Sequence, residues 1–155
     1  MIAALAPRYT WRTNPGGKKR TLSEALELAT QWEVKIPKYF EFHVASKTSP
    51  LAANEFARAP GFKEFDGTII KWEKLLNIRG RLPIRLNPSI FTSDEAIVAT
   101  IAHEVFEIGM LEEHFDSKEP IEKWEAETCS TNDGNFHCQA WDCADSLVKR
   151  MRGEA

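Results

Sequence analysis

One histidine and two glutamates at close spacing are the residues of this chain best suited to chemistry. They lie in residues 93–115, which read SDEAIVATIAHEVFEIGMLEEHF and predict a single long helix. At about 100° per residue, Glu107 lies near 40°, Thr100 near 60° and Glu104 near 100° from His103. The polar side chains of an otherwise apolar stretch therefore share roughly a quarter turn of the helix surface.

An apolar helix is normally a buried helix, so this polar arc needs a common partner. Burying an unpaired carboxylate costs several kcal/mol or forces it to become neutral. In the pattern His-Glu-x-x-His, two histidines bind zinc and the glutamate is the general base for a metal-bound water. Here Glu107 stands at the second histidine position, and a glutamate oxygen is also a good zinc ligand. The spacing predicts that His103 and Glu107 bind zinc or another divalent metal, with Glu104 as the base.

A catalytic zinc ion usually has three protein ligands, so a third must come from another segment. His137 lies at the centre of the apolar face of a predicted helix over residues 136–151 and is the preferred candidate. Three rival ligands lie in the preceding predicted helix, over residues 121–128: Glu122, Glu125 and Glu127. His114 shares the helical angle of His103 but lies roughly 16 Å away along the axis. Asp145 flanks the His137 face and is a candidate for orienting a ligand from outside the metal.

The composition describes an ordinary globular chain of 155 residues with a formal net charge of −3. This charge argues against a general nucleic-acid surface or anionic-membrane surface. There is no apolar run of the roughly 20 residues that a transmembrane helix needs, and no signal-peptide pattern. Three cysteines, at positions 129, 138 and 143, make no disulfide framework and no metal pattern. We expect structural cysteines and a reducing, cytosol-like compartment.

The elements that would position these residues predict an α+β fold. Residues 1–20 lack periodicity and are expected to be a flexible arm, and residues 21–155 a single catalytic domain. Strands are predicted near 39–45 and 83–87, as a small sheet packed against the 93–115 helix and the C-terminal helix. Residues 46–67 look like a long loop with one helical turn around 52–57, and Pro83 favours an edge strand or a strand start.

Several segments together resemble the C-terminal toxin domains of bacterial polymorphic toxins, including those of Rhs-type proteins. They are LPIRLNPS from residue 82, SDEAI from residue 93, AHE-x-x-EI from residue 102 and H-x-x-AWD-x-AD from residue 137. The helix of residues 93–115 is also similar to the metal-binding helix of zincin-type metallopeptidases, with one ligand changed. This resemblance implies a zincin-like fold and a secreted effector that acts in the cytoplasm of a target cell. It also implies a cognate immunity protein as partner.

The favoured function is metal-dependent hydrolysis of a peptide bond, with His103, Glu107 and His137 on the metal and Glu104 as proton acceptor. Tyr39 or His43 is a candidate to stabilise the oxyanion. Two alternatives stay open. One is a metal-independent RNase-type toxin that uses His103 and His137 as an acid–base pair. The other is a non-catalytic binding domain whose polar arc is a hydrogen-bond network.

Overall fold

The computed structural model describes residues 2–4, 9–61, 71–114, 121–128 and 134–154. Within these ranges the chain is α+β, as the sequence predicts. The strands are β1 (Ile2–Ala4), β2 (Phe40–Val44), β3 (Glu55–Arg58) and β4 (Leu82–Leu86). The α-helices are α1 (Leu22–Gln31), α2 (Trp72–Leu75), α3 (Asp94–His114), α4 (Ile121–Thr128) and α5 (Phe136–Met151), with 3₁₀ turns η1 (Pro15–Gly17) and η2 (Pro88–Thr92).

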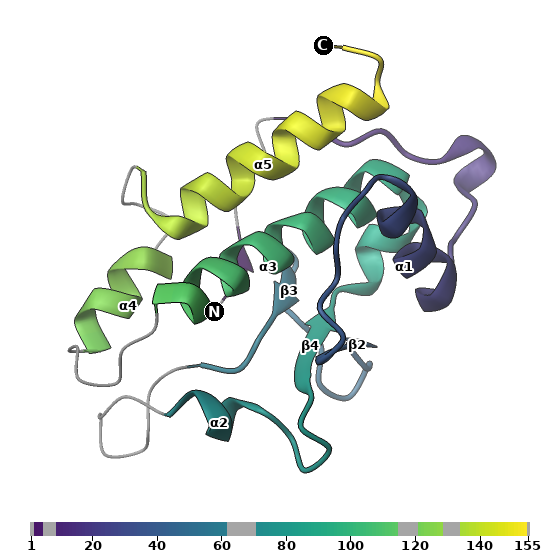
Figure 1. Cartoon of the computed structure of the whole chain (residues 1–155). Helices are drawn as coiled ribbons and strands as arrows, with labels where there is room; N and C mark the ends of the chain where they lie inside the picture. The colour runs from purple at the N-terminus through teal and green to yellow at the C-terminus, as the bar shows by residue number, and fades with distance from the viewer. Residues whose placement is uncertain (1, 5–8, 62–70, 115–120, 129–133, 155) are drawn as a thin grey trace.

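The long helix α3 lies in the middle of the molecule, with α5 running antiparallel beside it and the sheet on another side (Figure 1). Ser93 begins α3, because its hydroxyl accepts a hydrogen bond from the Ala96 amide at 3.1 Å. Every residue from Glu95 to Glu104 is buried. The prediction of a buried helix is therefore confirmed.

The two predicted strands are confirmed and pair in parallel as β2 and β4, within a sheet of order β1-β3-β4-β2. β4 is an interior strand only at its far end, because β3 pairs with Arg85 and Leu86 alone. Pro83 is the second residue of β4 and is paired only with β2, opposite Glu41, so it lies at the start of the strand and at an edge, as its sequence position predicts. The bond to β2 is made by the preceding amide, from Leu82 to the Tyr39 carbonyl at 2.7 Å, so the missing amide hydrogen of Pro83 breaks no ladder.

The predicted helical turn around residues 52–57 is wrong, since Glu55–Arg58 form strand β3. Glu55 and Ala57 are buried while Phe56 and Arg58 are less so, which is the alternation of a strand. Of the predicted long loop 46–67, residues 62–67 lie outside the described residues.

The first twenty residues were expected to form an arm, but their described part is held against the rest of the fold. Strand β1 pairs antiparallel with β3. Arg12 donates its amide to Glu95 at 2.8 Å, and Ser93 donates its hydroxyl to the Arg12 carbonyl at 2.6 Å. Backbone hydrogen bonds of this kind leave no periodicity in the side chains, which is why the sequence pattern does not reveal them.

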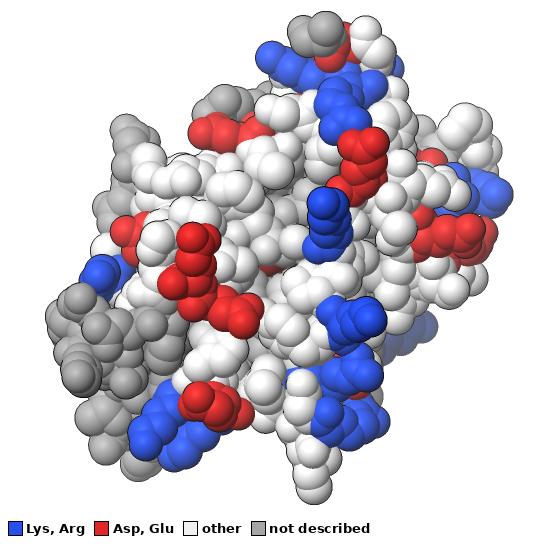
Figure 2. Space-filling view, in the orientation of Figure 1, with Lys and Arg blue, Asp and Glu red and all other residues white. Residues whose placement is uncertain are grey.

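The main core lies between α3, the sheet and α1, and includes Ile84 and Leu86 of β4 and Ile97, Ile101 and Ile108 of α3. A smaller cluster fills the contact between α3 and α5, made of Ala99, Trp141, Ala144 and Val148. Basic and acidic side chains are interspersed over the face seen in Figure 2, with a neutral area in its middle. Among the described helices, none combines the length and apolar content that crossing a lipid bilayer requires.

Candidate metal centre

Besides Glu95 at its start, helix α3 presents three ionisable side chains to the protein interior. His103, Glu104 and Glu107 have exposed fractions of 0 %, 1 % and 1 %. Their spacing places them on one side of the helix, because side chains three and four residues apart are neighbours on a helix surface. The quarter-turn arc predicted from the sequence is therefore a buried polar surface.

Helix α5 brings the second histidine to this surface. Asn135 begins α5 by accepting a hydrogen bond from the Cys138 amide at 2.8 Å, which fixes His137 in the first turn. His137 is 1 % exposed. Its ring centroid lies 4.9 Å from that of His103, with an angle of 77° between the ring planes. Two histidines that are 34 residues apart in the chain thus lie side by side.

The carboxylate of Glu107 lies between the two imidazoles. Its Oε2 is 3.2 Å from Nε2 of His103 and 3.3 Å from Nδ1 of His137. A tetrahedron with ~2.05 Å bonds, the length zinc makes to nitrogen and oxygen ligands, has edges of about 3.3 Å. The three ligand atoms lie within 4.8 Å of one another. Two of the three separations already match zinc coordination.

Glu104 lies beside the cluster and outside the group of three. Its Oε1 is 3.6 Å from Nδ1 of His103, the ring nitrogen that faces away from Glu107. If Nε2 of His103 binds a metal through its lone pair, Nδ1 carries the proton and faces a carboxylate. A histidine ligand in metalloproteins usually has such an acceptor for its other ring nitrogen.

The cluster contains buried polar atoms without a hydrogen-bond partner among the described residues. They include both ring nitrogens of His103, Oε2 of Glu104, Oε1 of Glu107 and the hydroxyl of Thr100. A buried polar atom that lacks a partner costs about 1–3 kcal/mol, and more if it is charged. A divalent cation at this point would satisfy His103 and Glu107 together, so the donor set fits one.

The rival third ligands do not join this group. Glu122 and Glu125 are exposed on α4, and Glu127 accepts a hydrogen bond from the Phe136 amide at 3.0 Å. His114 is exposed and stacks on Phe136 with 5.5 Å between ring centroids. Asp145 is buried on α5, at 4 % exposure, but is not one of the three clustered ligands.

The two residues considered for the oxyanion have other partners. The Tyr39 hydroxyl donates a hydrogen bond to Glu112, and burial is the main cause that raises the pKa of this tyrosine. His43 is half exposed and lies 2.8 Å from Glu41. Both side chains are therefore paired with residues outside the cluster of His103, Glu107 and His137. Cys138 and Cys143 lie on α5 and form no disulfide within the described residues, and Cys129 lies outside them.

One side of the cluster is covered by aromatic side chains that the sequence did not assign to the site. The Trp141 ring lies 4.3 Å from His103 between centroids and contacts Trp11 and Phe56 at 6.2 and 6.4 Å. Trp141 follows His137 by four residues, so its place on the same helical face was available as a signal. Trp11 and Phe56 come from distant segments, and no local pattern relates them to the site.

No protein-family model matches this chain, and no curated protein or solved structure matches it either. A function can therefore be argued only from the residues of the site and from their arrangement.

Proposed function

We propose that this protein is a metal-dependent hydrolase whose metal, most suitably zinc, is held by His103, Glu107 and His137. One observation carries the proposal: a buried carboxylate oxygen lies 3.2 and 3.3 Å from two imidazole nitrogens. Two histidines and a glutamate are the protein ligands of a known class of catalytic zinc site, which keeps its fourth position for water or substrate.

The chemistry assigned to each residue follows from its position. A bound zinc ion polarises a carbonyl and lowers the pKa of its water, which is what hydrolysis at neutral pH needs. Glu104 is buried and adjacent in sequence to the ligand His103; its Oε1 faces Nδ1 of His103, and its Oε2 has no hydrogen-bond partner among the described residues, so we assign Oε2 the role of proton acceptor. We extend the proposal to peptide bonds, to a zincin-like arrangement and to a toxin effector with an immunity protein, as the resemblance in sequence implies.

Metal analysis of the purified protein tests the ligand assignment. Mass spectrometry of the metals should find close to one zinc per chain in the wild type, and a large loss in His103→Ala and in His137→Ala. The exposed His43 provides the matched control, since His43→Ala removes a histidine and should leave the zinc content unchanged. Full metal occupancy in both ligand variants would overturn the assignment.

Glu104→Gln tests hydrolysis separately from metal binding. The variant should keep its zinc and lose peptide cleavage, measured on a mixed peptide library by mass spectrometry. Its expression in the cytoplasm of a bacterial host should also cease to arrest growth. Degradation of RNA that persists with a chelator would select the RNase alternative. Growth arrest by Glu104→Gln equal to that of the wild type would favour a non-catalytic binding domain.

A further inference from the structure

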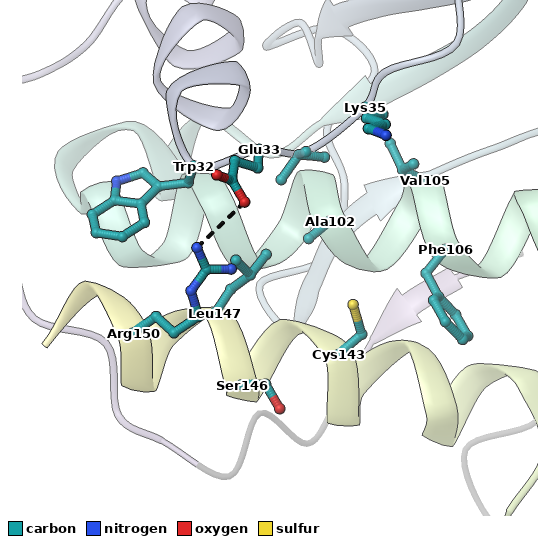
Figure 3. A pocket seen from close by; sticks show the side chains of 11 residues that line it. Trp32, Glu33, Lys35, Ala102, Val105, Phe106, Cys143, Ser146, Leu147 and Arg150 are labelled. Carbon is teal, nitrogen blue, oxygen red and sulfur yellow. Dashed lines mark ion pairs between the residues drawn. The ribbon is translucent and has the colours of Figure 1, made fainter. Parts of the chain in front are cut away.

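A groove of about 540 Å³ lies between the end of α1 and the neighbouring surfaces of α3 and α5. Figure 3 shows it bounded by the segment after α1 on one side and by α5 on the other. None of His103, Glu107 or His137 lines it. It is therefore a second candidate site, separate from the metal centre.

The floor of the groove is apolar. Val34, Ala102 and Leu147 are buried there, and Val105 and Phe106 of α3 are half-buried in its wall. Small-molecule sites in proteins are typically cavities of roughly 300–1,000 Å³ with mostly apolar walls and a few polar groups. The volume and the lining both suit the body of a small apolar ligand.

The rim of the groove is basic, with one acidic group. Lys35 and Arg150 are exposed at the rim, and the Arg150 guanidinium lies 3.6 Å from the Glu33 carboxylate (Figure 3). The side chains of Arg150 and Glu33 are 52 % and 79 % exposed, so their ion pair is weak and a competing carboxylate can displace it. Lys35 has no ion pair within the described part of the chain.

Glu33 also has an unfavourable backbone conformation. Its φ is 67°, and among the described residues no other non-glycine residue has a positive φ. The position follows the end of α1, where the Val34 amide donates to the Ala29 carbonyl at 3.0 Å and where glycine is the usual residue. A glutamate at this position carries the cost of that backbone conformation, and its carboxylate lies beside the Arg150 guanidinium.

We propose that the groove binds a small amphipathic carboxylate. Its head group pairs with Arg150 in place of Glu33, and its apolar body lies over Leu147 toward Phe106. Lys35 adds a second positive charge at the rim, which favours an anionic head over a cationic or neutral one. This site does not depend on the proposed hydrolase activity.

Calorimetric titration with decanoate below its micelle concentration tests the proposal, with decyltrimethylammonium and decanol as probes of equal chain length. Decanoate should bind at one site at least about tenfold more tightly than the cationic probe, the factor that 1.4 kcal/mol represents. Absence of saturable decanoate binding, or equal binding of all three probes, would overturn the proposal.

Two variants and one matched control locate the binding. Arg150→Gln should weaken decanoate binding about tenfold, whereas Lys149→Gln, which removes the neighbouring exposed cation outside the groove, should not. The Cys143 side chain points into the groove (Figure 3), so Cys143→Phe should abolish binding by filling it. Circular dichroism checks that each variant folds. Decanoate binding by Cys143→Phe as tight as that of the wild type would show that the groove is not the site.

A chemical test uses the same thiol without altering the groove. In a Cys129→Ser/Cys138→Ser background, Cys143 is the remaining cysteine. Decanoate should slow its reaction with a maleimide at least about threefold, because ligand and reagent compete for one space. An unchanged rate at a saturating decanoate concentration would contradict binding in the groove.

Discussion

At the scale of single residues, the unusual feature is Glu107, a buried carboxylate in contact with two buried imidazoles. A carboxylate in the interior must be neutral, hydrogen-bonded or paired with positive charge. Its Oε2 atom has both histidines as neighbours, and its Oε1 atom has no hydrogen-bond partner among the described residues. A bound cation would supply the positive partner that this buried carboxylate needs.

The first prediction concerns metal removal. Zinc at 100 times its dissociation constant should stabilise the wild type by about 2.7 kcal/mol, because it binds the folded chain and not the unfolded one. For a chain of this size that is a rise of roughly 5–10 °C in the melting temperature. Differential scanning calorimetry with zinc and with chelator measures it. His103→Ala should show almost no zinc effect, whereas the exposed-site control His114→Ala should respond like the wild type.

At the scale of elements, the site depends on how α3 and α5 begin and on what keeps them aligned. Ser93 begins α3 and Asn135 begins α5 through side-chain hydrogen bonds to the first turn. Where α3 begins and α5 ends, Arg152, which follows α5, donates two hydrogen bonds to Glu95 of α3, each 2.7 Å long. These contacts fix the angular position of each helix, and so bring His137 to His103.

The second prediction is that Ser93→Ala lowers the free energy of unfolding by about 1–2 kcal/mol. The hydroxyl accepts from the Ala96 amide and donates to the Arg12 carbonyl, so both partners lose a hydrogen bond. Urea unfolding measures the loss. Ser89→Ala serves as control, since Ser89 is exposed in η2. An equal stability loss in the control would mean that the capping bond contributes nothing particular.

The third prediction is a pH dependence from the Glu95–Arg152 pair. The hydrogen bond from Arg152 is the main cause that lowers the pKa of Glu95 from its usual value of 4.5. The pair therefore stabilises the fold fully above about pH 4.5, and this stabilisation is lost as the pH falls through the lower folded-state pKa. Unfolding free energies between pH 7 and pH 3 should fall less steeply for Glu95→Gln than for the wild type. Parallel curves for the two proteins would contradict the pairing.

At the scale of the whole molecule, the N-terminal segment covers the face of the α3–α5 pair on which Trp141 lies. Trp11 lies edge-on to Phe56 of β3, at 4.8 Å between ring centroids, and 6.2 Å from Trp141 of α5. One side chain thus joins the N-terminal segment, the sheet and the C-terminal helix. The Trp141 ring in turn contacts His103, so the packing of Trp11 reaches the site.

The fourth prediction is that Trp11→Ala lowers the free energy of unfolding by about 3 kcal/mol, the lower end for losing a tryptophan because Trp11 is only partly buried. Zinc affinity should also fall, since Trp141 loses a neighbour that holds it against His103. Urea unfolding and zinc titration measure the two effects. Tyr9→Ala removes a neighbouring, partly buried aromatic ring and should cost less stability. A fully stable Trp11→Ala protein would show that this contact is dispensable.

Much of the secondary structure could be predicted from the sequence, because it is decided by local patterns. The apolar stretch of α3 and the bounds of α5 are properties of short segments, and the structure agrees with each. Strand β3 could not be predicted. Its short sequence EFAR alternates too briefly to distinguish a strand from a turn, and it is stabilised by pairing with β1 and β4.

The sequence by itself determined that His103, Glu104 and Glu107 share one face of a buried helix, since helical geometry relates residues close in the chain. It also ranked His137 as the preferred third candidate from the apolar face around it. Only the tertiary structure decided that His137, and not Glu122 or Glu125, reaches Glu107, and that Trp11 and Phe56 help to close the site. Contacts between distant segments depend on how the faces of helices and sheet pack against one another, and the spacing of residues along the chain does not predict that packing.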